Sequence, residues 1–242
     1  MLDILYRDDC LVAINKPAGL LVHRSDIDRH ETRCAVQLLR NQIGQRVHPL
    51  HRLDKGTSGV LLFALDAGSA RAVGEQFQHE DVRKRYLAVV RGWPPESGVI
   101  DHALSRQFDD YGRKFGPESV AGALPAETEY RRLATVELSA AVDRYPTSRY
   151  ALMELRPATG RQHQLRRHMK HIAHPVIGDA TWGKGIHNRF FRQRFGCGRL
   201  LLTCARLELR HPRAGRALSI EAPLEGSFAG VVSALGWAAI VA

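Results

Sequence analysis

A single carboxylate lies in a strongly basic loop of this sequence. Asp54 stands in HRLDKGTSG (51–59), two residues after Arg52 and directly before Lys55. Both cations favour the ionised carboxylate, and the apolar run that follows the glycine-containing turn would hold the loop in place, as a reactive group requires. This stretch alone favours a structural interpretation instead, because an aspartate in such a turn often makes a turn hydrogen bond, here with Thr57 or Ser58.

A second basic segment, TGRQHQLRRH (159–168), begins with a turn and continues as a predicted helix. Arg161 and Arg166 flank His163 at the start of that helix, where free backbone N–H groups and the positive end of the helix dipole suit a phosphate. A solvated basic face is the alternative. Because a helix with only positive charges repels itself, contact with a polyanion is the better interpretation.

Four histidines in and after this segment could in principle bind a metal. His163, His168, His171 and His174 are spaced by five, three and three residues, and Asp179 could add a carboxylate. None of the familiar short metal-binding patterns is present, and arginines crowd the group. We therefore expect no metal here, and we assign these histidines to contacts with RNA or to hydrogen bonds in the core.

An aromatic residue, Tyr86, lies in the predicted strand KRYLAVVRG (84–92). Aromatic residues are common in half-buried strands, so packing alone would explain it. Alternatively its ring is a flat face on which a base stacks while Lys84 and Arg85 contact phosphates. The residues by themselves leave both interpretations open.

The composition restricts the class of protein. The chain has 242 residues, 44% of them hydrophobic, and a formal net charge of +10. Such a charge favours a polyanionic partner, while no apolar run approaches the roughly 20 residues that span a membrane. Its four cysteines form no CxxC pair, which is typical of reduced thiols in a cytoplasmic protein. The sequence also lacks G-x-S-x-G, P-loop and G-x-G-x-x-G motifs, which argues against hydrolases and nucleotide-binding enzymes of those types.

Apolar periodicity predicts the elements that position these residues. Helices are expected over 32–43 with Thr32 as the N-cap, over 68–79, in the later part of 158–172, and over 225–236. Strands are expected in a hairpin over 4–17 and over 60–65, 84–92, 127–137, 149–156, 200–209 and 217–222. Residues 101–126 are polar and glycine-rich, and we expect a long surface loop there.

These elements predict an α+β fold with a mixed, largely antiparallel central sheet flanked by helices and loops. Several strands follow one another without an intervening helix, which a purely parallel sheet does not allow. No long linker and no internal repeat divides the chain, so we expect one domain over residues 1–242.

Three of the quoted segments, with Asp54, Tyr86 and Arg166, resemble the signature segments of the RluA-type pseudouridine synthases. INKPAGLLVH (14–23) and HPVIGDATWG (174–183) are similar to two more segments of that family, and the resemblance covers nearly the whole chain. It implies the pseudouridine synthase fold with a central RNA-binding cleft, and a single catalytic domain without an N-terminal S4-like domain. One departure is Thr203 in Leu-Thr-Cys (202–204), where relatives usually have histidine, so the contribution of that histidine is in doubt.

The resemblance also implies roles for individual residues. Asp54 would be the catalytic carboxylate, Arg166 would pair with it, and Tyr86 would stack on the uracil and could assist the removal of the C5 proton. Whether Asp54 attacks C1′ or removes a proton from C2′ stays open. The substrate-binding set would consist of Leu165, which packs against the base, Arg52, which fills the space left by the flipped nucleotide or holds its phosphate, and the phosphate contacts Lys16, Lys84, Arg161 and Arg167.

The implied reaction is the isomerisation of a uridine in tRNA, namely uridine 65 at the base of the acceptor stem. Ribosomal RNA, alone or together with tRNA, is the alternative substrate. Because the reaction involves no redox change and no net hydrolysis, neither cofactor nor metal is expected. We expect a cytoplasmic monomer that needs no protein partner and does not bind membranes. Two rival hypotheses are a non-catalytic RNA-binding protein and a metal-dependent ribonuclease that uses the histidines.

Overall fold

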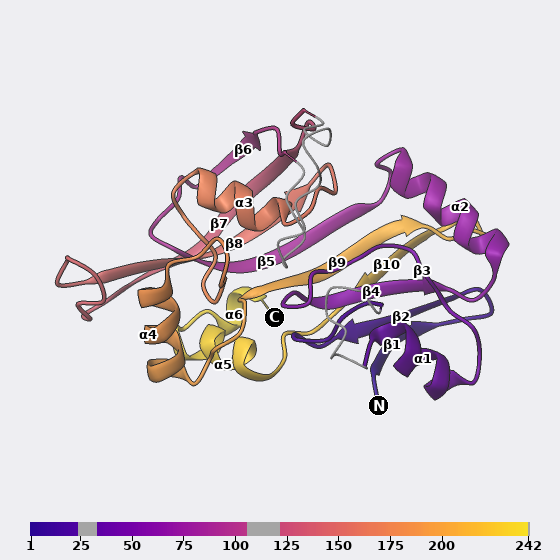
Figure 1. Ribbon diagram of the computed structural model, residues 1–242, viewed down its shortest axis with the longest axis horizontal. Coiled ribbons are helices and arrows are strands. Elements are labelled where there is room, and N and C mark those ends of the chain that lie inside the picture. Colours follow the sequence, from indigo (N-terminus) through magenta and orange to yellow (C-terminus); the bar gives the residue numbers. More distant parts are fainter. Residues whose placement is uncertain (24–32, 106–121, 242) are drawn as a thin grey trace.

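The computed structural model describes residues 1–23, 33–105 and 122–241, and its centre is one large twisted sheet (Figure 1). The strands follow the order β1-β2-β4-β9-β5-β8-β7-β6, with β10 paired to β9 and β3 paired to β4. Their bounds are β1 Asp3–Arg7, β2 Leu11–Lys16, β3 His48–Pro49, β4 Ser58–Ala64, β5 Arg83–Arg91, β6 Ser97–Asp101, β7 Glu127–Leu138, β8 Ser148–Pro157, β9 Leu202–Arg210 and β10 Ala217–Glu221.

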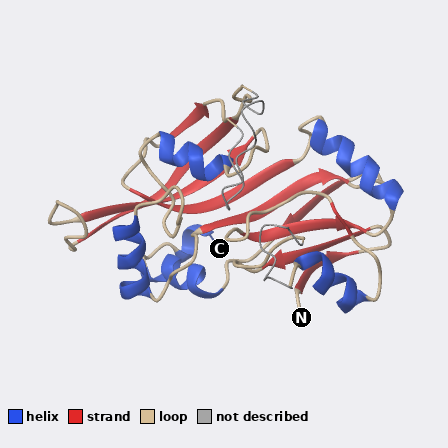
Figure 2. Cartoon of the chain, viewed as in Figure 1, coloured by secondary structure: helices blue, strands red, loops and turns tan. Residues whose placement is uncertain are grey.

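Six helices within the described residues lie around this sheet (Figure 2). Their bounds are α1 Ala35–Ile43, α2 Ala67–Gln78, α3 Gln164–His171, α4 Gly185–Phe195, α5 Gly226–Ala234 and α6 Ala238–Val241. None of these helices combines the length and the apolar character that crossing a bilayer would require. The expected α+β class with a mixed, largely antiparallel sheet is confirmed.

The parallel contact in the sheet joins β4 to β9 and explains a glycine of the first basic segment. Ser58 pairs with Thr203 and Gly59 with Cys204. Gly59 has φ 103°, and a Cβ on it would lie 2.1 Å from the carbonyl oxygen of Cys204. Only glycine fits this close approach of two backbones, so Gly59 lets β9 lie directly beside the strand that follows Asp54.

Two hydrophobic clusters use alternate residues of the same central strands. In β5, Ala88 and Val90 contribute to one cluster, which also contains Leu165 and Met169 of α3. Val89, which lies between them, belongs to the other cluster, together with residues of α4 and α5. Because successive side chains of a strand point to opposite faces, the central sheet separates α3 on one side from α4 and α5 on the other.

Three expectations about elements need correction or fall outside the described residues. The helix expected from Thr32 is described from Ala35, with Cys34 as its N-cap, and Thr32 itself lies outside the described residues. Within the loop expected over 101–126, residues 106–121 are likewise not described. Its flanks are paired through a bridge between Leu104 and Leu124, and its first residue closes the unpredicted strand β6.

Helix α4 was also missed by the sequence analysis. Its N-cap Lys184 makes no side-chain capping bond, and the first turn contains no acidic residue, so the usual signals for a helix start are absent. Only His187 and Phe191 are buried on it. A short basic helix that buries so little gives a weak periodic pattern.

Candidate active site

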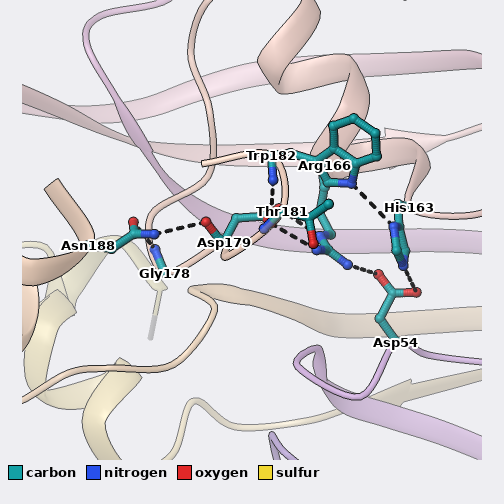
Figure 3. Close-up of polar contacts among 8 residues, drawn as sticks. All are labelled: Asp54, His163, Arg166, Gly178, Asp179, Thr181, Trp182 and Asn188. Atoms are coloured by element: carbon teal, nitrogen blue, oxygen red, sulfur yellow. Dashed lines mark hydrogen bonds and ion pairs between the residues drawn. The ribbon is translucent and has the colours of Figure 1, made fainter. Parts of the chain in front are cut away.

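Asp54 lies in the loop that leads from β3 into β4, and its main chain rather than its side chain closes the turn. The N–H of Thr57 donates to the carbonyl oxygen of Asp54 at 3.1 Å. The carboxylate instead faces α3, where Nη1 of Arg166 donates to its Oδ2 at 3.0 Å (Figure 3). The turn therefore orients Asp54 and leaves its carboxylate available to the site.

Arg166 bridges two carboxylates with one guanidinium group. Its Nε and Nη2 donate to Oδ2 and Oδ1 of Asp179 at 2.6 and 2.8 Å, while Nη1 holds Asp54. The Arg166 side chain is 10% exposed, Asp179 is completely buried and Asp54 is 29% exposed. Burial alone would lower the pKa of Arg166, but the hydrogen bonds and charges of Asp179 and Asp54 raise it above its usual range. The guanidinium is thus permanently charged and fixed in direction.

Asp179 is the anchor of this arrangement. Burial by itself raises the pKa of its carboxyl group, but the bidentate contact with Arg166 outweighs that effect and the pKa is lowered. Its Oδ1 also accepts from the backbone N–H groups of Thr181 and Trp182, both at 2.9 Å. Asn188 of α4 donates to the Asp179 carbonyl oxygen at 2.8 Å. Helix α4, which the sequence does not predict, therefore helps to position Asp179.

His163 approaches Asp54 from the other side. Its Nε2 lies 3.9 Å from Oδ1 of Asp54, and its Nδ1 accepts from the indole N–H of Trp182 at 3.2 Å (Figure 3). The backbone of His163 is left-handed, with φ 53°, at the N-cap of α3. Sequence reasoning weighed His163 as a metal ligand or RNA contact and did not connect it with Asp54.

Gln164 holds the start of α3 against β7. Its Oε1 accepts from the hydroxyl group of Thr159 at 2.7 Å and from the N–H of Arg161 at 3.0 Å. Its Nε2 donates to the carbonyl oxygen of Glu127 at 2.8 Å and to the hydroxyl group of Thr128 at 3.0 Å. All of the amide hydrogen-bonding capacity is used, which rigidly places the residues on either side, His163 and Leu165.

Tyr86 and Leu165 belong to the same buried cluster, and both side chains are almost fully covered. Tyr86 pairs across the sheet with Cys204. Burial raises the pKa of Tyr86 well above its usual range, and Cys204 and Asp54 raise it further. The phenol therefore stays protonated near neutral pH. Stacking of uracil on Tyr86 stays a prediction, but a phenolate that would remove the C5 proton does not fit this environment.

Lys16 does not lie where a phosphate could reach it. Its side chain at the end of β2 is fully buried, and Nζ donates to the carbonyl oxygens of Pro17, Leu20 and Lys55 at 3.0, 2.7 and 3.2 Å. The structure thus contradicts the expectation of a phosphate contact. Because Lys55 follows Asp54, Lys16 instead ties the end of β2 to the loop that contains Asp54.

The other expected RNA contacts lie near the surface. Arg52 and Arg161 are exposed, and Nε of Arg161 donates to the carbonyl oxygen of Pro125 at 3.0 Å. Arg167 donates to the carbonyl oxygen of Ser105 at 2.9 Å, and its guanidinium carbon lies 5.6 Å from the ring centroid of Trp182. Lys84 is partly buried, which lowers its pKa. Their contacts with RNA stay predictions.

The expected central RNA-binding cleft also stays a prediction. A hollow of about 640 Å³ between α2 and the β9–β10 pair is lined by Gln76, Asp81 and Arg83 among others, and none of the site residues lines it. Residues 24–32 and 106–121 lie outside the described residues. Thr203, at the position where relatives usually have histidine, is buried beside Ser58.

The four histidines considered as metal ligands are used in other ways. Both ring nitrogens of His168 lie 3.0 Å from partners, Oγ1 of Thr128 and the carbonyl oxygen of His102. Nδ1 of His174 lies 2.9 Å from the carbonyl oxygen of Arg91, and His171 stacks on His102 with ring centroids 3.8 Å apart. The hydrogen bonds expected for these residues are therefore present for His168 and His174.

A different cluster, Asp8, Cys10 and His211, has three potential ligand atoms within 4.8 Å of one another. Nδ1 of His211 accepts from the backbone N–H groups of Arg213 and Ala214. In a neutral imidazole the proton is then on Nε2, which lies 2.7 Å from Oδ2 of Asp8. A metal ion on Nε2 would have to displace that proton, so the cluster fits a structural hydrogen-bond network better than a metal site.

Comparison with known proteins places this geometry in a family. Residues 10–171 match the family model described as RNA pseudouridylate synthase. The tRNA pseudouridine synthase C of Vibrio cholerae is 49% identical over 98% of this chain and 97% of its own length. The protein of the same name from Pectobacterium carotovorum is 50% identical over the full chain, which spans 64% of that relative's length.

Solved structures agree with the sequence relatives. Human RNA Pseudouridylate Synthase Domain Containing 4 has a TM-score of 0.72 and 27% identity, covering 97% of this chain and 93% of its own. Human RNA Pseudouridylate Synthase Domain Containing 1 has a TM-score of 0.70 and 26% identity, covering 98% and 95%. The chain belongs to the RNA pseudouridylate synthase family and is an RNA pseudouridine synthase, an isomerase.

Proposed function

We propose that this enzyme converts a uridine in tRNA to pseudouridine, with uridine 65 at the base of the acceptor stem as its target. The names of its relatives in Vibrio and Pectobacterium support tRNA as the substrate, and the net charge of +10 suits any RNA. The position is the one that the family resemblance implies. The proposal includes action by one catalytic domain, as a monomer in the cytoplasm.

The reaction breaks the bond between ribose C1′ and uracil N1, and the detached base rotates. C5 then bonds to C1′ and loses its proton, while N1, released from the ribose, gains one, so the product has the composition of the substrate. We assign the required carboxylate to Asp54, acting either on C1′ as a nucleophile or on the C2′ proton. Tyr86 and Leu165 hold the base, and Arg166 holds Asp54 in position through the hydrogen bond from Nη1 to Oδ2.

The observation that carries this proposal is the buried chain of contacts from Asp179 through Arg166 to Asp54. A fully buried Asp179 binds Nε and Nη2 of Arg166 and leaves Nη1 of the guanidinium to donate to Asp54, at 3.0 Å. An ordinary surface aspartate needs no such support. A reactive carboxylate does, because its rotamer and its charge must both be maintained in a site that closes over a polyanion.

The test measures tritium released from tRNA that carries uridine labelled at C5, together with mapping of the modified position. Wild type should release tritium from tRNA with uridine 65 but not from tRNA in which cytidine replaces it. Asp54→Asn should bind tRNA normally and lose at least about 100-fold in turnover. The matched control Asp3→Asn, at an exposed aspartate of β1, should behave like wild type.

Two results would contradict the proposal. If Asp54→Asn retains a tenth of the wild-type rate, Asp54 is not the reacting carboxylate. If tritium is released from ribosomal RNA but not from any tRNA, the substrate assignment is wrong although the chemistry stands.

A further inference from the structure

The two oxygens of Asp54 have different partners, and the second partner has no assigned role. Oδ2 accepts from Arg166 at 3.0 Å. Oδ1 lies 3.9 Å from Nε2 of His163, whose side chain is 5% exposed. Figure 3 shows the imidazole and the guanidinium approaching the carboxylate from two sides. Oδ1 is therefore the oxygen that stays available for reaction.

The tautomer of His163 follows from its neighbour Trp182. An indole N–H can only donate, and it lies 3.2 Å from Nδ1 of His163, so Nδ1 is the acceptor. In the neutral imidazole the remaining proton is on Nε2, the atom nearest to Oδ1 of Asp54. Trp182 thus directs an N–H donor of His163 toward the reactive carboxylate.

Both partners of Asp54 are fixed by one buried residue, Asp179. Its carboxylate binds the Arg166 side chain and also accepts from the backbone N–H of Trp182 at 2.9 Å. One chain of contacts runs from Asp179 through Arg166 to Oδ2 of Asp54. The other runs from Asp179 through Trp182 and His163 to Oδ1 of Asp54. Once Nε2 of His163 also binds Oδ1, the carboxylate is held in two places and cannot rotate about its terminal bond, which a single contact allows.

The backbone of His163 indicates that its position is imposed by its surroundings. A non-glycine residue in the left-handed region costs free energy and persists where neighbouring contacts determine it, often at functional sites. Here the amide of Gln164, bound to Thr128 and Glu127, supplies that constraint.

We propose that His163, oriented by Trp182, is a positioning residue that restrains Oδ1 of Asp54 in the direction of the ribose. At 3.9 Å the contact is too long for a hydrogen bond. Catalytic hydrogen bonds are often long without substrate and tighten in the complex, so the Nε2–H bond to Oδ1 forms when the uridine binds. The proposal rests on Asp54 as the reacting carboxylate, which Asp54→Asn tests separately.

Two substitutions at His163 distinguish the loss of its N–H donor from the loss of its contribution to the fold. His163→Asn suits the left-handed backbone and keeps an acceptor near Nδ1, but it cannot reach Asp54. His163→Gln places an amide N–H near the position of Nε2 and loses the ring. Under saturating tRNA, His163→Asn should lower kcat about 10- to 100-fold with KM within about twofold of wild type, and His163→Gln should recover most of the rate.

Trp182→Phe completes the test, since it keeps an aromatic ring beneath Arg167 and Lys170 and removes the indole N–H together with the second ring. It should lower kcat about 5-fold in wild type and have no effect in the His163→Gln background, where no imidazole needs orientation. His79→Asn, at an exposed histidine that ends α2, is the control and should not change kcat.

Equal losses from Trp182→Phe in both backgrounds would overturn the proposal, because Trp182 would then act independently of His163. So would a His163→Asn variant that raises KM without changing kcat, which would make His163 an RNA contact. A His163→Gln variant as slow as His163→Asn would also contradict it. Thermal unfolding of each variant shows whether a rate loss reflects misfolding, and loss of kcat at an unchanged Tm supports the positioning role.

Discussion

At the scale of single residues, Arg166 has a task that another cation cannot perform. Three of its five N–H groups donate to carboxylates, two to Asp179 and one to Asp54. A guanidinium group offers N–H groups in a rigid plane, whereas an ammonium group is a point charge on a flexible chain. Charge alone therefore does not reproduce the bridge between the two carboxylates.

We expect Arg166→Lys to lose about 100-fold in kcat while tRNA binding stays close to wild type. The lysine keeps the charge but can satisfy only one carboxylate well, so Asp54 is displaced from its position. Single-turnover tritium release gives the rate, and Arg167→Lys on the same helix is the control. A wild-type rate for Arg166→Lys would show that the site requires only a positive charge.

At the scale of elements, the long strands and the two basic loops could be predicted from the sequence, but the scaffold beneath the site could not. Apolar runs identify β4, β5, β8 and β9 because those strands are buried. Asp179 was considered only as a metal ligand, since its partner Arg166 lies 13 residues away across a loop. Spacing along the chain predicts neighbours within one helix or strand, and it does not predict which loops meet.

Lys16 shows the same limit, because its basic character suggested a phosphate contact and only the structure reveals its burial. It connects the end of β2 to Lys55 in the loop of Asp54. Burial lowers its pKa to about 7, although the nearby charge of Asp54 acts in the opposite direction. In the unfolded chain an ordinary lysine keeps its proton until about pH 10.4.

A testable consequence concerns stability above neutral pH. Between pH about 7 and about 10.4 the unfolded chain binds more protons at Lys16 than the folded protein does, so rising pH favours the folded state. The free energy of unfolding of wild type should therefore rise relative to Lys16→Met by up to about 1.4 kcal/mol per pH unit. Urea unfolding of both proteins at about pH 7.5, 8.5 and 9.5 measures the difference between wild type and Lys16→Met across the range in which Lys16 titrates. A constant difference would mean that the three carbonyl groups keep Lys16 fully protonated.

At the scale of the whole molecule, partly buried His51 beside β4 and buried His187 of α4 are expected to make the fold sensitive to acid. His51 lies three residues before Asp54, and its Nε2 accepts from the N–H of Leu62 at 3.2 Å. His187 of α4 accepts at Nε2 from Arg91 and lies 2.8 Å from the Tyr150 hydroxyl group through Nδ1. Burial, followed by a neighbouring cation, lowers the pKa of each to about 4.

These lowered pKa values determine the direction of the effect. Between pH about 6.5 and about 4 the unfolded chain binds protons at both positions and the folded protein does not. The free energy of unfolding should therefore have its full value above pH about 6.5. It should decrease on acidification, by up to about 3 kcal/mol per pH unit for the two histidines together. The double variant His51→Gln with His187→Gln lacks both titrating groups but keeps polar side chains, so its stability should depend less on pH. Urea unfolding of both proteins between pH 4.5 and 7, about the span of the two titrations, measures the slopes. Parallel slopes would show that other groups, such as His168 and His174, whose pKa values are also lowered by burial, cause the loss, and the two histidines would then be packing residues without a role in the acid response.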